Sequence, residues 1–184
     1  MKITKIIAVL MIVLMTLVVA GCDKDNNPQT NKNTNTVVEN KTEKTADEKI
    51  KVKVYFPNND ATRLVAVEKT VKTSGTNKYK AVMEALMEGT NDSKLSVVMP
   101  KQAKLLGVSV SGDTAKVDFD KALVKNFNGG STGEEFLVGS IVNTLTEFPE
   151  IKKVQITIEG RNVESIKGHM DTSKPLPRMD ELLK

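Results

Sequence analysis

The sequence predicts an α+β fold: a two-layer domain with two helices on one face of a mixed β-sheet. Several stretches alternate apolar and polar residues, as strands with one polar face do, and fully covered parallel sheets lack this pattern. Two other stretches repeat apolar residues at helical spacing. The order is strand, strand, helix, hairpin, helix, strand. Two layers then bury both apolar stripes against one sheet face and leave the other face to water or a partner.

The chain begins with the features of an export leader. Lys2 and Lys5 precede an apolar run over residues 6–20. This run of 15 residues is short for crossing a hydrocarbon core of about 30 Å, but it suits the apolar region of a signal peptide. Small residues follow it, in the string Val-Ala-Gly-Cys that ends at Cys22. We therefore expect residues 1–21 to be a lipoprotein signal peptide.

Cys22 is the only cysteine, which excludes an intramolecular disulfide and a cysteine-based metal site. The residues before it resemble the bacterial lipobox, in which the peptidase cuts before a cysteine whose thiol carries diacylglycerol. Two fatty acyl chains, such as palmitate, give the stable anchoring that one chain does not. We expect Cys22 to be lipidated. The alternative is an uncleaved apolar anchor with an incidental cysteine.

Residues 22–49 are expected to be the lipidated cysteine and a disordered tether. Residues 23–49 contain six Asn, five Thr and five Lys, and their only large aliphatic side chains are Val37 and Val38. Such a segment buries too little apolar surface to offset its ordering entropy. Without Lys2 and Lys5, 25 basic side chains face 23 acidic ones, a balance that gives little support for nucleic-acid binding, and the expected export argues against it. Residues 50–184 then form a single domain.

The first half of this domain contains two strands and a helix. Apolar residues alternate over 50–56, the cluster 57–60 predicts a turn, and a second β-rich stretch covers 64–71. Asn77 is expected to cap a helix that ends near Gly89. Its apolar stripe consists of Tyr79, Val82, Met83, Leu86 and Met87.

The second half opens with a predicted hairpin, residues 106–110 and 115–119 joined by a Gly-Asp loop, and a short helical stretch over 120–127. Ser131 and Glu134 indicate a capping box at the start of the second helix, and Pro149 stops that helix. A last clear strand covers 153–159. We expect a strand or loop return after it, and then a short helix over 177–183.

Few residues indicate chemistry. His169, the only histidine, is interpreted as a turn residue that bonds Asp171 or the backbone, so neither a catalytic triad nor a zinc site is expected. Asp118 and Asp120 are predicted to share a strand face, and Glu135 lies beside Glu134 at a helix start. A solvated face and helix capping explain these acids without catalysis.

Aromatic residues are scarce, and Tyr55, on the expected wet side of the first strand, is the one candidate for stacking on a sugar. A half-buried strand tyrosine is the alternative. No metal and no cofactor are expected.

Five strings resemble the GerM-type sporulation and spore germination domain (GerMN) of Firmicute lipoproteins, in the family's order and over about residues 50–178. Asp120 departs from the family, which usually has Ser there. Many members also carry a second such domain or an amidase domain, for which this chain has no room. The strings are VYFPNNDATRLVAVEKTV, AVMEALMEG, VVMPKQAKLLGVSVSGDTAKVDFDKAL, GGSTGEEFLVGSIVNTLTEFPEIKKVQITIEG and GHMDTSKPL.

The resemblance implies an α+β domain similar to ring-building modules. It also implies a role in the cell envelope, in sporulation, germination or peptidoglycan-associated assembly. It supplies no catalytic residue.

The leading hypothesis is a membrane-anchored extracytoplasmic lipoprotein that binds or assembles and is not an enzyme. Its partners would be the membrane, through the lipid, and an envelope protein or peptidoglycan, but no nucleic acid. The candidate binding residues are Tyr55, Asp118, Glu135, His169 and Asp171. One alternative is an enzyme that acts on peptidoglycan through carboxylates such as Asp118 or Glu135. A small-ligand uptake protein ranks last, since one domain lacks the two lobes of a usual binding protein.

Overall fold

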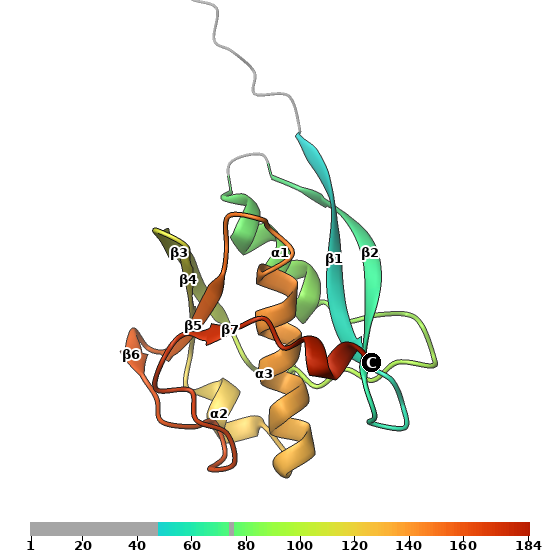
Figure 1. Ribbon diagram of the computed structural model, residues 1–184, viewed down its shortest axis with the longest axis vertical. Coiled ribbons are helices and arrows are strands. Elements are labelled where there is room, and N and C mark those ends of the chain that lie inside the picture. Colours follow the sequence, from blue (N-terminus) through green and yellow to red (C-terminus); the bar gives the residue numbers. More distant parts are fainter. Residues whose placement is uncertain (1–47, 74–75) are drawn as a thin grey trace, which may run out of the picture. The chain divides into compact units, whose positions relative to one another are not determined.

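The computed structural model describes residues 48–73 and 76–184, which form an α+β domain (Figure 1). The predicted signal peptide, Cys22 and nearly all of the predicted tether lie outside the described residues. The principal helices are α1 (Lys78–Met87) and α3 (Ser131–Leu145), with a short α2 (Ala122–Asn126) and a 3₁₀ helix, η1 (Asp180–Leu183). The strands are β1 (Lys49–Pro57), β2 (Leu64–Lys72), β3 (Leu105–Ser111), β4 (Thr114–Phe119), β5 (Lys153–Ile158), β6 (Arg161–Asn162) and β7 (Leu176–Pro177).

The strands fall into two sheets. β3, β4, β5 and β6 lie side by side in that order, and β7 also pairs with β5. This sheet is mixed, because β4 and β5 are parallel and the other pairs are antiparallel. The predicted α+β class, with helices against one face of a mixed sheet, is confirmed. The structure adds a second sheet, the antiparallel hairpin of β1 and β2, on the opposite side of the helices (Figure 1).

Helix α3 lies at the centre and contacts α1, both sheets and η1. The predicted face of Leu137, Ile141 and Leu145 is buried, but so is every other residue from Phe136 to Leu145. The sequence predicts burial on one face only, because several of the residues on the other faces are polar. Close packing also uses Gly139, since a Cβ there would collide with Leu182 of η1.

The connections follow the sequence signals in part. Gly112 has φ +58° in the two-residue turn between β3 and β4, as a type II′ hairpin turn requires. Asn77 caps α1 by accepting a hydrogen bond from the Lys80 N–H at 2.7 Å, and its side-chain amide donates to the Val108 carbonyl at 2.9 Å. The same residue therefore starts the helix and fastens it to the edge of β3.

The predicted capping box of α3 is wrong. The cap residue is Gly130, which offers no side-chain hydrogen bond, and Ser131 is the first helical residue. Glu134 does not reach back to the cap, because its carboxylate binds a distant loop instead. The predicted C-terminal helix is also shorter than expected: it comprises only η1, and β7 precedes it.

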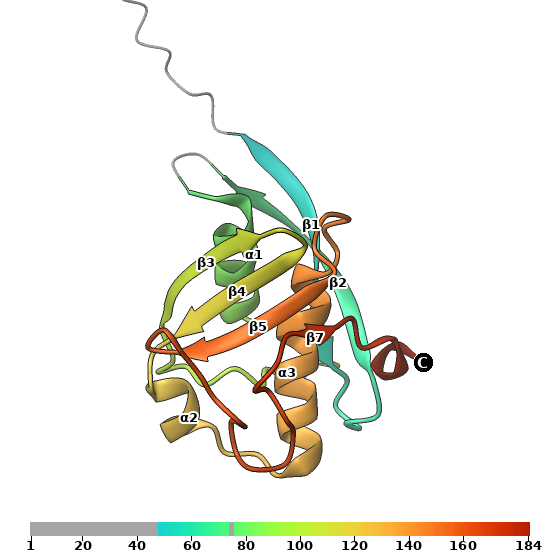
Figure 2. The same cartoon turned by 60° about the vertical axis from the view of Figure 1, so that its left-hand side comes forward.

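The segment from residue 161 to the end of the chain crosses one edge of the large sheet and then returns past β5 and α3 (Figure 2). Gln155 and Thr157 are buried although they lie on the outer face of β5. The predicted wet face of the sheet is therefore confirmed at Ser109 and Lys116 but wrong at β5. The side chain of Gln155 donates to the Thr172 carbonyl at 2.9 Å, which fastens the returning segment.

Candidate functional site

The predicted site residues come from four parts of the fold. Tyr55 lies on β1, Asp118 on β4 and Glu135 on α3, whereas His169 and Asp171 lie in the loop between β6 and β7. Only these last two line the same surface hollow, together with Glu164, Ser165, Gly168, Met170 and Ser173.

Asp118 holds a turn. Its carboxylate accepts hydrogen bonds from the Thr157 hydroxyl at 2.8 Å and from the Gly160 N–H at 2.7 Å. Glu159 and Gly160 have φ values of +50° and +78°, so the chain between β5 and β6 turns through left-handed conformations. These bonds give Asp118 a structural role. Glu135, by contrast, is exposed near the start of α3.

Glu134 is fully buried and organises the loop that carries His169. One carboxylate oxygen accepts from the Ser165 hydroxyl at 2.6 Å and from the N–H groups of Ile166 and Lys167 at 2.9 and 3.0 Å. The other accepts from the His169 N–H at 2.9 Å. A buried carboxylate is tolerated here because these donors replace its water.

The pKa of Glu134 reflects the same balance. Burial favours the neutral acid and raises the pKa. The hydrogen bonds from the Ser165 hydroxyl and the backbone N–H groups together lower the pKa by more than burial raises it, so the pKa of Glu134 lies below its ordinary value. Glu134 is thus an anionic anchor for residues 165–169. The sequence signal was a glutamate two positions before a run of apolar residues, and the predicted capping box assigned it another role.

The predicted bond between His169 and Asp171 is not what the structure shows. The His169 backbone binds Glu134, in keeping with the backbone alternative, whereas Asp171 accepts hydrogen bonds from the Ser173 N–H and hydroxyl at 2.9 and 2.6 Å. The Ser173 bonds lower the pKa of the Asp171 carboxyl. Asp171 therefore stabilises its own turn. His169 itself is exposed.

A second polar cluster, which the sequence analysis missed, joins Tyr55, Glu147 and Arg178. The Tyr55 hydroxyl donates to Glu147 at 2.5 Å and accepts from the Arg178 guanidinium at 2.8 Å. Arg178 also pairs with Glu147 at 2.8 Å and lies 5.3 Å from the centre of the Tyr55 ring. Tyr55 is only 4 % exposed, so the prediction that it faces water is wrong. The cluster ties β1, the end of α3 and the C-terminal segment together.

Charges in this cluster depend on one another. Burial and the bond to Glu147 raise the pKa of Tyr55. Burial would raise the pKa of Glu147, but hydrogen bonds from Tyr55 and Arg178 bring it below its ordinary value. Glu147 is therefore an anion at neutral pH and Tyr55 a neutral donor, as the hydrogen bonds require.

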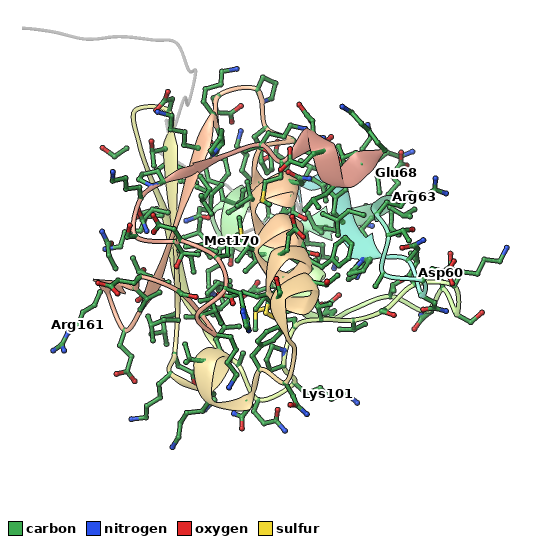
Figure 3. All side chains as sticks on the ribbon, turned by 60° about the horizontal axis from the view of Figure 1, so that its bottom comes forward. Asp60, Arg63, Glu68, Lys101, Arg161 and Met170 are labelled. Atoms are coloured by element: carbon green, nitrogen blue, oxygen red, sulfur yellow. The ribbon has the colours of Figure 1, made fainter. Side chains whose placement is uncertain are left out.

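A slot opens beside this cluster, where β1 meets the chain that follows α3. It has a volume of about 230 Å³ and is lined by Lys51, Val52, Lys53, Glu68, Glu147 and Phe148. Typical small-molecule pockets hold about 300–1,000 Å³, so the slot is small for a cofactor. Figure 3 shows Glu68 on the hairpin side of α3 and Met170 on the other side, so the slot and the His169 hollow are separate.

An aromatic pair supports the wall of the slot. The Phe148 ring packs edge to face with Tyr79 at 4.9 Å, and the Lys78 ammonium lies 5.0 Å from both ring centres. Glu150 binds Lys78 and the Tyr79 hydroxyl, and these bonds lower its pKa to about 2. Phe148 is thereby held in place beside β1.

Within residues 48–73 and 76–184, no group of three or more His, Cys, Asp or Glu side chains is placed to hold a metal ion. Over the same residues, no helix has both the length and the apolar character needed to cross a bilayer.

Comparisons with known proteins agree with this fold. A family described as "Germane: Sporulation and spore germination" matches residues 53–164. The structure of a "Putative Lipoprotein from Clostridium perfringens" aligns with 73 % of this chain and 89 % of its own, at 22 % identity and a TM-score of 0.52. The tandem GerMN domains of the sporulation protein GerM from Bacillus subtilis align with 76 % of this chain, at 22 % identity and a TM-score of 0.58. The alignment spans 49 % of that tandem structure. No curated protein matches.

Proposed function

Because the chain belongs to the Germane family of sporulation and spore germination domains, we propose that it acts as a lipid-anchored binding or assembly module on the outer face of the cell membrane. The observation that carries the proposal is the use of its carboxylates. Asp118, Glu134 and Glu147 bind groups of the domain itself. Side chains occupied in this way suit a rigid binding body better than a catalytic centre.

The anchor is supported by the leader and by Cys22, whose surroundings resemble a lipobox. A similar fold in a protein described as a lipoprotein also supports it. The tether that the sequence predicts between Cys22 and β1 would, at about 5–6 Å × √n, keep the domain within about 30 Å of the membrane on average. An envelope protein or peptidoglycan within that reach is the proposed partner.

The first test measures whether purified peptidoglycan sacculi retain the full mature chain in detergent. The second cross-links the protein to its neighbours in sporulating cells and, separately, in vegetative cells. Retention by sacculi, or one reproducible cross-linked envelope protein, supports a binding module. The proposal is contradicted if sacculi do not retain the protein and no envelope protein cross-links to it in either kind of cell.

Release of soluble wall fragments would support the alternative, an enzyme that uses carboxylates. That reading requires Asp118→Asn or Glu135→Gln to abolish the release. Glu135 is the better candidate of the two, since its side chain is exposed.

A further inference from the structure

Only some backbone groups are hydrogen-bonded along the edge of β1 that faces away from β2. β1 pairs with β2 on one side, and backbone groups of alternate residues face opposite sides of a strand. On the side away from β2, the Tyr55 N–H donates to the Thr144 hydroxyl at 3.1 Å and the Pro57 carbonyl accepts from the Ser96 N–H at 2.8 Å. Lys51 and Lys53 have the same parity, so their N–H and C=O groups face this side too.

No described residue bonds these groups of Lys51 and Lys53. They lie at the slot, whose far wall is formed by Glu147 and Phe148. The slot therefore combines a stretch of unpaired strand edge with a wall that carries one aromatic ring and one carboxylate. An extended polypeptide satisfies such an edge, because its own backbone supplies the matching donors and acceptors.

The charges select the kind of polypeptide. Lys49, Lys51 and Lys53 recur at every second residue and therefore project from the same face of β1. Lys51 pairs with Glu68 at 3.0 Å, with side chains 75 % and 63 % exposed, whereas Lys53 lies 3.7 Å from Glu147, whose side chain is only 22 % exposed. The exposed Lys51–Glu68 pair contributes little stability, so an incoming carboxylate can replace Glu68 as the partner of Lys51. A basic strand would be repelled.

We propose that the β1 edge at Lys51–Lys53 binds an extended acidic peptide segment of a partner protein by adding a strand to the β1–β2 sheet. Carboxylates on one face of the segment would meet the lysines, and an apolar side chain would contact Phe148. This rests on the proposed function and names the class of partner: a polypeptide with alternating acidic and apolar residues.

The test measures binding of a capped peptide of alternating Glu and Val to the full mature chain in detergent. Two matched peptides serve as controls, one with Lys in place of Glu and one with its backbone nitrogens methylated. Strand addition predicts that each change weakens binding about tenfold or more, because one reverses the charge and the other removes the donors. It also predicts that the bound peptide slows hydrogen exchange at the amides of Lys51 and Lys53.

Protein variants separate the two contributions. Lys53→Gln removes only a charge, whereas Lys53→Pro also removes an edge N–H that β2 does not use. The proline variant should bind more weakly than the glutamine variant. Equal binding of the methylated peptide, equal binding of the Lys peptide, or no binding at millimolar concentration overturns the proposal. Those results would leave the state of Cys22 and binding to sacculi unchanged, so they are distinguishable from failure of the proposed function.

Discussion

Replacing Glu134 with Gln tests whether a buried anion organises the His169 loop. The amide keeps the volume and one acceptor oxygen, so the bonds to Ser165, Ile166 and Lys167 can persist in weaker form. An NH₂ group would replace the other oxygen and face the His169 N–H, so two hydrogen-bond donors would meet with no acceptor between them. Hydrogen bonds to charged groups contribute about 1.5–3 kcal/mol, and an orphaned buried donor costs about 1–3 kcal/mol. We expect a loss of about 2–4 kcal/mol in the free energy of unfolding.

The assay is urea unfolding at pH 7, with Glu135→Gln as the matched control on the same helical turn. Because Glu135 is exposed, its replacement should change stability by no more than about 0.5 kcal/mol. Hydrogen exchange should quicken at Ile166, Lys167 and His169 in the Glu134 variant. Equal stability of the two variants would refute the anchoring role.

The same pair of proteins gives a pH dependence with a definite sign. The pKa of Glu134 is lower in the folded state than its ordinary value, so its charged form stabilises the fold. This contribution is complete above the ordinary pKa of a glutamate and is lost as the pH falls through the folded-state pKa. The stability gap between the wild type and Glu134→Gln should therefore hold from pH 7 to about pH 5 and narrow in more acidic solution. A gap that widens on acidification would contradict the assigned sign.

Three further predictions concern packing, the tyrosine cluster and the anchor. Gly139→Ala should lower stability by about 1–3 kcal/mol in thermal unfolding because its Cβ collides with Leu182, whereas Gly133→Ala in the same helix has room and should be neutral or stabilising. Tyr55→Phe should lower the free energy of unfolding by about 1–2 kcal/mol, because it removes the hydroxyl between Glu147 and Arg178. Tyr79→Phe, at a partly exposed position, should lower it by less, and equal losses would argue against the stabilising role of the Tyr55 cluster. Cys22→Ala should move the protein from the membrane fraction to the soluble or unprocessed fraction on immunoblots, whereas unchanged membrane partition would count against acylation.

The elements were predictable because their signals are local. The alternation around Val52, the cap at Asn77 and the Gly112 turn each depend on a few neighbouring residues, and the structure places a strand, a helix start and a hairpin there. The division of strands between two sheets was not predictable in this way. It depends on α3 being covered on all sides, which a single apolar stripe does not indicate.

The polar contacts were less predictable, because their partners are distant in sequence. Glu134 binds residues more than thirty positions later, and Tyr55 meets Arg178 across 123 residues. From the sequence alone, Glu134 matches a capping box and Tyr55 matches a wet strand face. Both interpretations fail because the C-terminal segment folds back over α3 and β1 and supplies donors that local patterns do not reveal.

Mass spectrometry of the protein extracted from native membranes tests the central claim most directly. A lipid-anchored module predicts a mature chain that begins at Cys22 and carries a diacylglyceryl group on its sulfur. A chain that retains residues 1–21, or one that begins at Cys22 with an unmodified thiol, would contradict the claim.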